Sequence, residues 1–331
     1  MNKDVERIID EKYSLIDAEI SRAFPKKGIS NLYDAVWYHL DTGGKRIRPA
    51  LAIITCEALG GDAKKVLPFA AACEILHNWL LIHDDIEDQD KIRRNKETVW
   101  VKYGLAHGIN VGDYMSHKVF ELILNSKNYG LDDKTILKLV EIIINTTVKT
   151  AEGQSMDINL RNSDNPSEKM YMEMAKAKTA YYLTVPMIGG AIIADADDRL
   201  IQKIIEYGEK IGPAYQISDD ILDLTEGKGR KEVGRDIKEG KKSILVIHCL
   251  SECSNDEKKK LLSILNKDPA KTPKTDVDYV KRLFLKYGSI DYARKKAKNL
   301  SEEAKNEVKD FPPKLRDLLN YFADYLVERE K

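Results

Sequence analysis

Apolar residues recur with the period of an α-helix along most of this 331-residue chain, and this period constrains the fold more than any other feature. Segment 5–20 places valine, isoleucine and leucine along one stripe, and segments 134–154 and 198–224 repeat the pattern. Glycine and proline stand mostly between such segments. Alternating strand-like runs bounded by hairpin turns are not evident. We therefore predict an all-α fold of ten or more helices with essentially no sheet.

No shift in composition divides the chain clearly into domains. The basic, glycine-punctuated stretch 226–242 and the proline-containing stretch 266–276 are predicted to be loops. Both are short enough to lie inside one domain. Length alone would allow about two domains, but we predict a single domain over residues 1–331.

Charge and hydropathy narrow the classes of function. Lysine plus arginine equals aspartate plus glutamate at 54 each, so the chain has no bulk attraction for nucleic acid. No stretch approaches about 18 uncharged apolar residues, so we expect no membrane span. The first twenty residues are charged and amphipathic, without an apolar signal core. We expect a cytoplasmic protein whose cysteines are free, buried or half-buried thiols, because no C-x-x-C pair is formed by Cys56, Cys73, Cys249 and Cys253.

The pattern D-D-x-x-D occurs twice, at 84–88 and at 219–223. On a helix, the first and last aspartates of each triplet lie one turn apart on the same face. Like charges at that spacing repel, but a divalent cation and a polyanion together would neutralise them. Oxygen ligands suit Mg²⁺, and no cysteine or histidine pair has zinc-type spacing. Either triplet alone also fits a solvated acidic helix end. Each follows an apolar run, which favours a metal–phosphate site.

Basic residues flank both triplets. Arginine suits bidentate contact with phosphate, and lysine supplies a mobile point charge. Any one of these residues alone is more often a solvated surface charge, but their positions around both triplets favour binding of phosphate groups. They are Lys45, Arg46 and Arg48 in "GGKRIRP", Arg93 and Arg94 in "KIRRN", Lys178, and Lys231 and Lys241 after the second triplet.

The order of these pieces resembles the trans-isoprenyl diphosphate synthases, or polyprenyl synthetases. The matching segments span about residues 40 to 245: "GGKRIRP", "EILHNWLLIHDDIEDQDKIRR", "NVGDYM", "GQSMD", "KT", "YQISDDILD" and "GRDIKEGKKS". The resemblance implies helices around a deep central cavity, of the isoprenoid synthase type, and usually a homodimer. It implies Mg²⁺-dependent condensation of isopentenyl diphosphate with an allylic diphosphate. Ionisation, condensation and proton loss follow in that order, with the released diphosphate as the base.

The same resemblance assigns roles position by position. It implies that isopentenyl diphosphate is bound by Lys45, Arg48, His77 and Arg94, and that Mg²⁺ is bound by Asp84, Asp88 and Asp219. It implies contacts to the allylic diphosphate from Arg93, Lys178, Lys231 and Lys241, with Thr179 and Gln216 near the reacting carbon and Gln154 and Asp157 as a supporting polar pair. Apart from the resemblance, His83 directly precedes the first triplet and is interpreted as a packing residue, or one that supports the ligands from behind, and not as a ligand.

The chain departs from the family pattern in its loops. Family members commonly have R-R-G-x-P-T after the first triplet, whereas this chain has "RRNKET", with Asn95 and Glu97. The usual G-K-P-V-G segment is "RKEVG" here, with Arg230 in place of a glycine. These departures concern loop geometry more than catalytic charge.

Trp79 is the candidate for setting product length. It lies five positions before Asp84, about 7.5 Å along a helix axis, where a bulky ring would block a growing prenyl tail. The alternative is ordinary core packing of a large indole. An aromatic residue only at this position resembles the geranylgeranyl diphosphate synthases of the archaeal type, with farnesyl diphosphate as the second candidate product.

Three other functions compete with this interpretation. A class I terpene cyclase also ionises allylic diphosphates with Mg²⁺, but it has no use for "GGKRIRP" and His77. A non-catalytic partner subunit tends to lose an aspartate triplet, and both triplets are intact. A helical interaction protein would give the flanking cations no role.

Overall fold

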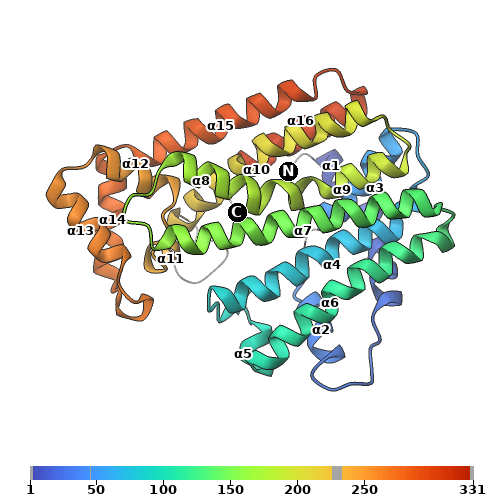
Figure 1. The fold of residues 1–331 in the computed structure, drawn as a ribbon, viewed down its shortest axis with the longest axis horizontal. Coiled ribbons are helices and arrows are strands. Elements are labelled where there is room, and N and C mark those ends of the chain that lie inside the picture. The colour runs from blue at the N-terminus through green and yellow to red at the C-terminus, as the bar shows by residue number, and fades with distance from the viewer. Residues whose placement is uncertain (1–2, 45, 226–232, 329–331) are drawn as a thin grey trace. The chain divides into compact units, whose positions relative to one another are not determined.

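The computed structural model describes residues 3–44, 46–225 and 233–328. Within these ranges the chain is almost entirely helical, which confirms the all-α prediction and the expectation of ten or more helices (Figure 1). The contacts divide the chain into two compact units. The first contains Met1–Thr146, Tyr182–Ile205 and Asp310–Leu318, and the second contains Thr147–Tyr181, Glu206–Lys309 and Leu319–Lys331. The expectation of a single domain stays a prediction.

The first unit is built around a long, apolar helix, α4 (Ala63–Glu87). Asp62 caps this helix by accepting a hydrogen bond from the Lys64 backbone N–H at 2.9 Å. Helices α3 and α6 pack along α4, and α1 contacts it as well (Figure 1). The other elements of this unit are α1 (Lys3–Ala23), α2 (Tyr33–Leu40), α3 (Ile47–Ala58), β1 (Ile92–Arg93), β2 (Lys96–Glu97), α5 (Val99–Tyr103), α6 (Leu105–Asn125) and η1 (Ser126–Tyr129).

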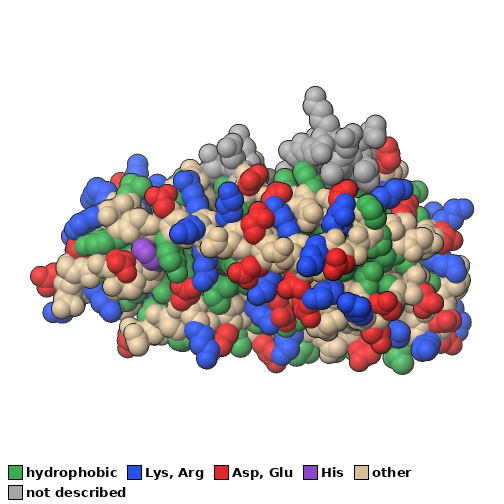
Figure 2. All heavy atoms as spheres, turned by 90° about the horizontal axis from the view of Figure 1, so that it is seen from above, with side chains coloured by type: hydrophobic (Ala, Val, Ile, Leu, Met, Phe, Trp, Pro, Cys, Tyr) green, Lys and Arg blue, Asp and Glu red, His purple; other side chains and the backbone are tan. Residues whose placement is uncertain are grey.

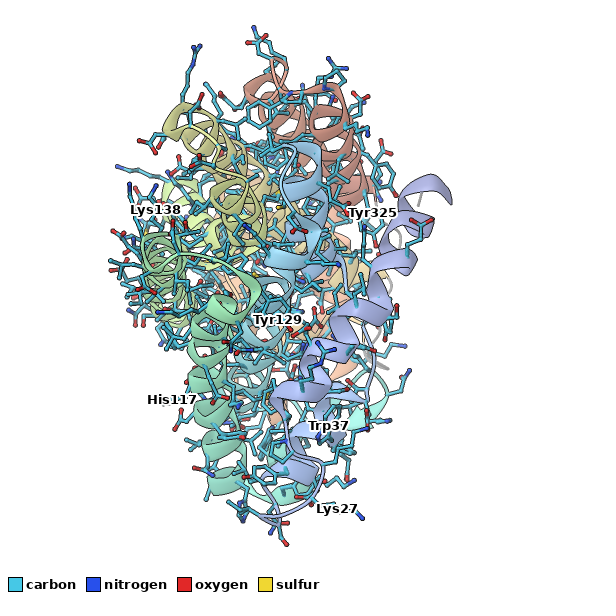
Figure 3. All side chains as sticks on the ribbon, turned by 90° about the vertical axis from the view of Figure 1, so that its right-hand side faces the viewer. Lys27, Trp37, His117, Tyr129, Lys138 and Tyr325 are labelled. Carbon is cyan, nitrogen blue, oxygen red and sulfur yellow. The ribbon has the colours of Figure 1, made fainter. Side chains whose placement is uncertain are left out.

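Both faces of α4 are buried over most of its length, so it lacks the polar face of a surface helix. In the described part of the chain, α4 is the one helix long and apolar enough to cross a membrane. However, 72% of its most apolar 18-residue window is buried inside the structure. A core helix meets the same criteria of length and composition. A polar contact joins η1 to α1: the Tyr129 hydroxyl donates to the Glu19 carboxylate, whose two oxygens lie 2.6 and 2.7 Å from it. Tyr129 is labelled in Figure 3.

The second unit gathers the helices from the carboxyl-terminal half of the chain. Helices α12, α14 and α15 contact one another, and α12 also contacts α8. The elements are α8 (Glu168–Ala175), the π-helical turn η2 (Lys176–Ala180), α11 (Arg235–Lys238), α12 (Ile244–Glu252), α13 (Asn255–Leu265), η4 (Pro269–Lys271), α14 (Lys274–Lys286) and α15 (Ser289–Glu307). Four helices contribute residues to both units: α7 (Asp133–Arg161), α9 (Tyr181–Ile193), α10 (Asp198–Thr225) and α16 (Pro313–Glu328).

A short antiparallel hairpin pairs β1 with β2, which the helical period did not predict. All four cysteines are free, three of them buried, as expected. Basic and acidic side chains are interspersed over the face shown in Figure 2, in keeping with the zero net charge.

His39 on α2 makes the stability of the fold depend on pH. Its side chain is 3% exposed, and burial together with the nearby Arg93 and Arg94 guanidiniums lowers its pKa to about 3. An unfolded chain protonates this imidazole near pH 6.5, whereas the folded chain does not. The stabilising effect is therefore complete above pH 6.5 and is lost as the pH falls toward 3. Between pH 7 and pH 4.5, we expect the free energy of unfolding of the wild type to fall by about 2–3 kcal/mol more than that of His39→Leu. Denaturant unfolding at both pH values measures this, with exposed His117→Leu as the control; parallel pH curves for His39→Leu and wild type would contradict it.

Candidate functional site

The first acid triplet lies where α4 ends. Asp88 is the residue that follows the last helical position, and its backbone N–H still donates to the Asp84 carbonyl at 2.9 Å. Asp84 and Asp88 therefore keep the one-turn spacing that the sequence predicted. The carbonyl end of a helix disfavours negative charge, so these carboxylates need cations nearby.

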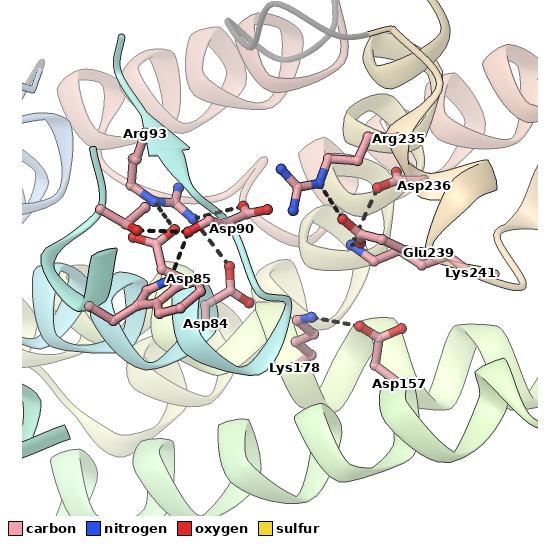
Figure 4. Close-up of polar contacts among 12 residues, drawn as sticks. Asp84, Asp85, Asp90, Arg93, Asp157, Lys178, Arg235, Asp236, Glu239 and Lys241 are labelled. Carbon is pink, nitrogen blue, oxygen red and sulfur yellow. Dashed lines mark hydrogen bonds and ion pairs between the residues drawn. The ribbon is translucent and has the colours of Figure 1, made fainter. Parts of the chain in front are cut away.

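Arg93 supplies a cation to this cluster (Figure 4). Its Nε donates to Asp85 Oδ1 at 2.7 Å, and its Nη2 lies 3.4 Å from Asp84 and 3.8 Å from Asp90. Asp85 and Asp90 are buried, whereas the Asp84 side chain keeps 29% of its exposure. Burial raises the pKa of Asp85 to about 7, although Arg93 opposes the shift. The buried acids thus hold Arg93 in place, and Asp84 remains accessible to a ligand.

The β1–β2 hairpin positions Arg93 and Arg94. Arg94 and Asn95 form its two-residue turn, with φ of 50° and 62°. Two consecutive positive φ values define the type I′ turn that suits a tight hairpin, and asparagine tolerates this conformation better than most residues. Asn95 therefore meets the backbone requirement at the position where the family commonly has glycine. Glu97 pairs with Ile92 in the hairpin.

A second basic group lies around Tyr182 at the start of α9. The Arg48 guanidinium is 5.0 Å from the Tyr182 ring centroid, and Arg48 Nη2 is 3.4 Å from the Tyr182 hydroxyl oxygen. The His77 ring is parallel to the Tyr182 ring within 5°, with centroids 6.3 Å apart. Tyr182 thus joins two residues that the resemblance assigns to one substrate. Sequence reasoning missed it, because a tyrosine far along the chain carries no signal of this contact.

Arg94 belongs to the same basic group. It donates to the Gly43 carbonyl and, at 3.2 Å, to Thr42 Oγ1 in the glycine turn before α3. Burial lowers the pKa of Arg94, and neighbouring arginines add to this effect. Burial also places the pKa of His77 well below its usual range, with Arg48 and Arg94 lowering it further. Two guanidiniums, those of Arg48 and Arg94, thus lie close enough to one imidazole to lower its pKa, an arrangement that favours binding of an anion. Lys45, from the same predicted set, lies outside the described residues.

Arg46 has a different environment from Arg48. It adopts a left-handed conformation with φ of 48° and points its guanidinium into the unit. Its Nη1 donates to Glu74 Oε1 at 2.7 Å, and its Nε donates to Asp17 Oδ1 at 3.2 Å. Asn78 also donates to Glu74 Oε1, at 2.9 Å. Arg46 is therefore a buried structural cation that ties the turn before α3 to α4 and α1.

The second acid triplet, on α10, is divided between accessible and buried carboxylates. Asp219 is half-buried, whereas Asp220 and Asp223 are 5% and 0% exposed. Asp220 accepts hydrogen bonds from Tyr171 Oη at 2.7 Å and from Gln216 Nε2 at 3.2 Å. Asp223 accepts from the Asp236 backbone N–H at 3.0 Å, which fixes the start of α11. Of the three, Asp219 is the most accessible to a ligand.

The π-helical turn η2 carries Lys178 and Thr179. Lys178 Nζ donates to Asp157 Oδ2 at 2.7 Å (Figure 4). Thr179 Oγ1 donates to Gln216 Oε1 at 3.2 Å. Burial would raise the pKa of Asp157, but Lys178, Lys241 and Arg161 outweigh it and lower the pKa. π-helical turns occur often at functional sites, because they redirect side chains within a helix.

Two glycines make room for η2. A Cβ at Gly153 of α7 would lie 2.1 Å from the Lys178 backbone nitrogen, and a Cβ at Gly212 of α10 would lie 2.5 Å from the Ala180 Cα. Real Cβ contacts are never this short, so any other residue at either position would displace backbone.

The remaining lysines of the predicted site lie after the second triplet. Lys241 Nζ is 3.3 Å from Asp236 Oδ1 and 3.1 Å from Glu239 Oε2, and its side chain is 16% exposed. Lys231 and the Arg230 departure lie outside the described residues. Among the residues described, no three cysteine, histidine, aspartate or glutamate side chains converge on one metal position. The carboxylates of Asp84 and Asp88 in the first unit, and of Asp219 in the second, are hard oxygen donors of the kind that Mg²⁺ prefers. Asp84 and Asp219 are half-buried, whereas Asp88 is 9% exposed.

Comparisons with known proteins show the family to which this chain belongs. The family model for polyprenyl synthetase matches residues 29–282. The chain is 38% identical to a geranylgeranyl diphosphate synthase of Saccharolobus solfataricus, with 93% of each protein covered. It is similar to the crystal structure of geranylgeranyl pyrophosphate synthetase from Pyrococcus horikoshii Ot3, with a TM-score of 0.90, 34% identity and 99% of each chain covered. A further match, at 25% identity, a TM-score of 0.88 and coverage of 99% and 98%, is a polyprenyl synthase from Caulobacter crescentus CB15 complexed with calcium and isoprenyl diphosphate.

Proposed function

Because this chain belongs to the polyprenyl synthetase family, we propose that it is a prenyltransferase that condenses isopentenyl diphosphate with allylic diphosphates and releases geranylgeranyl diphosphate. The observation that carries the proposal is the basic group of Arg48, His77 and Arg94 around Tyr182. A terpene cyclase acts on one diphosphate and has no use for a second anion site. Two relatives, at 38% and 37% identity, are named geranylgeranyl diphosphate synthase, and a third, at 38%, is named short chain isoprenyl diphosphate synthase.

The basic group provides the site for isopentenyl diphosphate. Arg48 and Arg94 are held by aromatic and backbone contacts, so little side-chain entropy is lost when they bind a diphosphate. His77 has a lowered pKa and is neutral near pH 7, so its N–H is a neutral donor to the same anion. Lys45 completes this set by its place in the family motif.

The allylic diphosphate is held through the acid triplets and their cations. Asp84, Asp88 and Asp219 are the proposed Mg²⁺ ligands, and Mg²⁺ bound there offsets the negative charge that grows on the leaving diphosphate. Preorganised cations stabilise that charge at no cost of reorganisation during the reaction. These cations are Arg93, Lys178, Lys231 and Lys241, and Thr179 and Gln216 are the polar groups assigned near the reacting carbon.

The chemistry then needs little from the protein beyond binding. Breaking the allylic carbon–oxygen bond leaves a carbocation, which the isopentenyl double bond attacks, and a proton leaves the new chain. Water must be excluded, because it would quench the cation. The released diphosphate is the proposed base, so no activated serine or cysteine is required.

Trp79 is proposed to limit product length. It lies one turn before His83, which contacts α6, and about 140° around the α4 axis from Asp84. We expect Trp79→Ala to lengthen the products by at least one five-carbon unit, because it removes a large ring from the path of the tail. Chromatography of the dephosphorylated products measures this. An unchanged length distribution would show that Trp79 is ordinary packing.

A homodimer is proposed from an apolar surface in the first unit. Leu137 and Ile144 stand two turns apart on α7 and are 67% and 46% exposed. Leu105, Ile109 and Leu124 on α6 are also exposed. We expect the Leu137→Asp/Ile144→Asp variant to sediment as a monomer where wild type sediments as a dimer. Leu285→Asp is the control, because Leu285 is 68% exposed on α14. If both this variant and the control sediment as dimers, this surface is not the interface.

The cytoplasmic location stays a prediction.

The decisive test uses purified protein with isopentenyl diphosphate, Mg²⁺ and each short allylic diphosphate in turn. Elongation with at least one allylic primer is expected, and it should cease when EDTA removes the metal. Product formation from an allylic diphosphate alone would favour a cyclase. No consumption of isopentenyl diphosphate with any primer would overturn the proposal.

A further inference from the structure

The indole of Trp79 is anchored by a neighbouring histidine. Trp79 Nε1–H donates to Nδ1 of His83, one turn further along α4, at 3.2 Å. The two rings are nearly perpendicular, at 83°, with centroids 6.3 Å apart. A hydrogen bond of this kind selects one orientation of a ring that otherwise has several staggered rotamers.

The same imidazole reaches the next helix. Because Nδ1 accepts from the indole, the network assigns the imidazole proton to Nε2. His83 Nε2 lies 3.4 Å from the Ile109 carbonyl oxygen and 3.6 Å from Asp113 Oδ1, both on α6. One tautomer therefore satisfies every contact, and His83 links the indole to a second helix.

Gly112 on α6 gives the imidazole its space. A Cβ at this position would lie 2.1 Å from His83 Nε2. The Gly112 backbone is helical, so glycine is needed here for room and not for an unusual φ. The three contacts, with Trp79, Ile109 and Gly112, place the imidazole as a wedge between the indole and α6.

We propose that His83 is a positioning residue for product length: it fixes the Trp79 indole, and thereby determines how many additions precede release. The inference rests on the proposed function. Product length is a competition between release and another addition, so a modest change in the orientation of a blocking ring changes the product ratio. Loss of one hydrogen bond shifts such a ratio by about five-fold.

Three variants separate the contact from simple packing. Trp79→Phe keeps an aromatic ring without the N–H, and His83→Ala removes the acceptor. His83→Gln can accept from the indole through its amide oxygen and donate to Ile109 through its amide nitrogen. His117→Ala is the matched control, because His117 is an exposed histidine on α6 whose hydrogen bonds within the described residues go to Ser116 and the Asp113 carbonyl (Figure 3).

The readout is the ratio of longer to wild-type-length product at equal consumption of isopentenyl diphosphate, which is independent of turnover. We expect Trp79→Phe and His83→Ala to raise this ratio about three- to ten-fold, and the double variant to add little further, because both remove one contact. His83→Gln and His117→Ala should keep the wild-type ratio.

An unchanged ratio in Trp79→Phe overturns the inference, and this variant leaves the residue next to Asp84 untouched. A shift in His83→Gln as large as that in His83→Ala also overturns it, because packing and not hydrogen bonding would then be responsible. If the wild type consumes no isopentenyl diphosphate, the proposed function itself fails. If the wild type is active but the variants keep its product ratio, only the inference about His83 fails.

Discussion

Asp84→Asn should lower turnover by about a hundred- to a thousand-fold or more while leaving the protein folded. The Asp84 carboxylate is the accessible member of the first acid cluster, and it keeps 29% of its exposure while Asp85 and Asp90 are buried around Arg93. Loss of one metal ligand removes transition-state stabilisation of several kcal/mol, about this factor in rate. Asparagine keeps the size of the side chain, so packing is conserved. Steady-state rates at saturating substrates and a Mg²⁺ titration measure the effect.

Glu87→Gln is the matched control for this prediction. Glu87 belongs to the same acidic run but is exposed, so its neutral variant should keep turnover within a few-fold of wild type. Equal losses in both variants would mean that the total charge of the run matters and that Asp84 has no special role. A normal rate in Asp84→Asn would remove Asp84 from the metal site.

Glu74→Gln should lower the free energy of unfolding by about 3–5 kcal/mol, because it leaves the buried Arg46 guanidinium without its closest counter-charge. The Arg46 and Glu74 side chains are each only 5% exposed, and their contact is 2.7 Å long. Asp17, at 3.2 Å and 40% exposed, compensates only in part. Denaturant unfolding monitored by circular dichroism measures the loss.

The double variant Arg46→Met/Glu74→Leu should be less destabilised than either single charge removal, since no buried charge remains unpaired. Asp133→Asn is the surface control: its partner Lys127 is 68% exposed, so we expect a change below about 1 kcal/mol. A cost for Glu74→Gln as small as for Asp133→Asn would show that the buried pair contributes little to stability.

Helical periodicity was enough to predict the all-α fold. Residue types in a fixed order gave the charged groups of the site, whose roles stay predictions. The two acid triplets and "GGKRIRP" can be recognised in the sequence because their chemistry requires carboxylates one turn apart and cations after a tight turn. Gly43 and Gly44 have positive φ values, which fit a turn before these cations. Periodicity likewise identified α7 and α10, because long amphipathic helices repeat their pattern many times.

Tertiary contacts of single residues were beyond the sequence. The stacking of Tyr182 on His77 joins distant segments and leaves no local pattern. Arg46 and Arg48 look alike in "GGKRIRP", but one is buried against Glu74 and the other lies over an aromatic ring, since the left-handed backbone at Arg46 turns it inward. A hairpin with two-residue strands shows no detectable period either.

The close packing of η2 between Gly153 and Gly212 has a consequence for laboratory evolution of this enzyme. Random libraries will contain many substitutions at these two positions, and nearly all should be lost to selection whatever product is selected. Trp79 and His83, by contrast, tolerate smaller side chains in principle, because such changes remove contacts with a neighbouring ring, the Ile109 carbonyl and Gly112 instead of inserting atoms into a crossing backbone. A library that holds the two glycines constant and varies Trp79 and His83 should therefore contain more folded variants, and these should differ in product length.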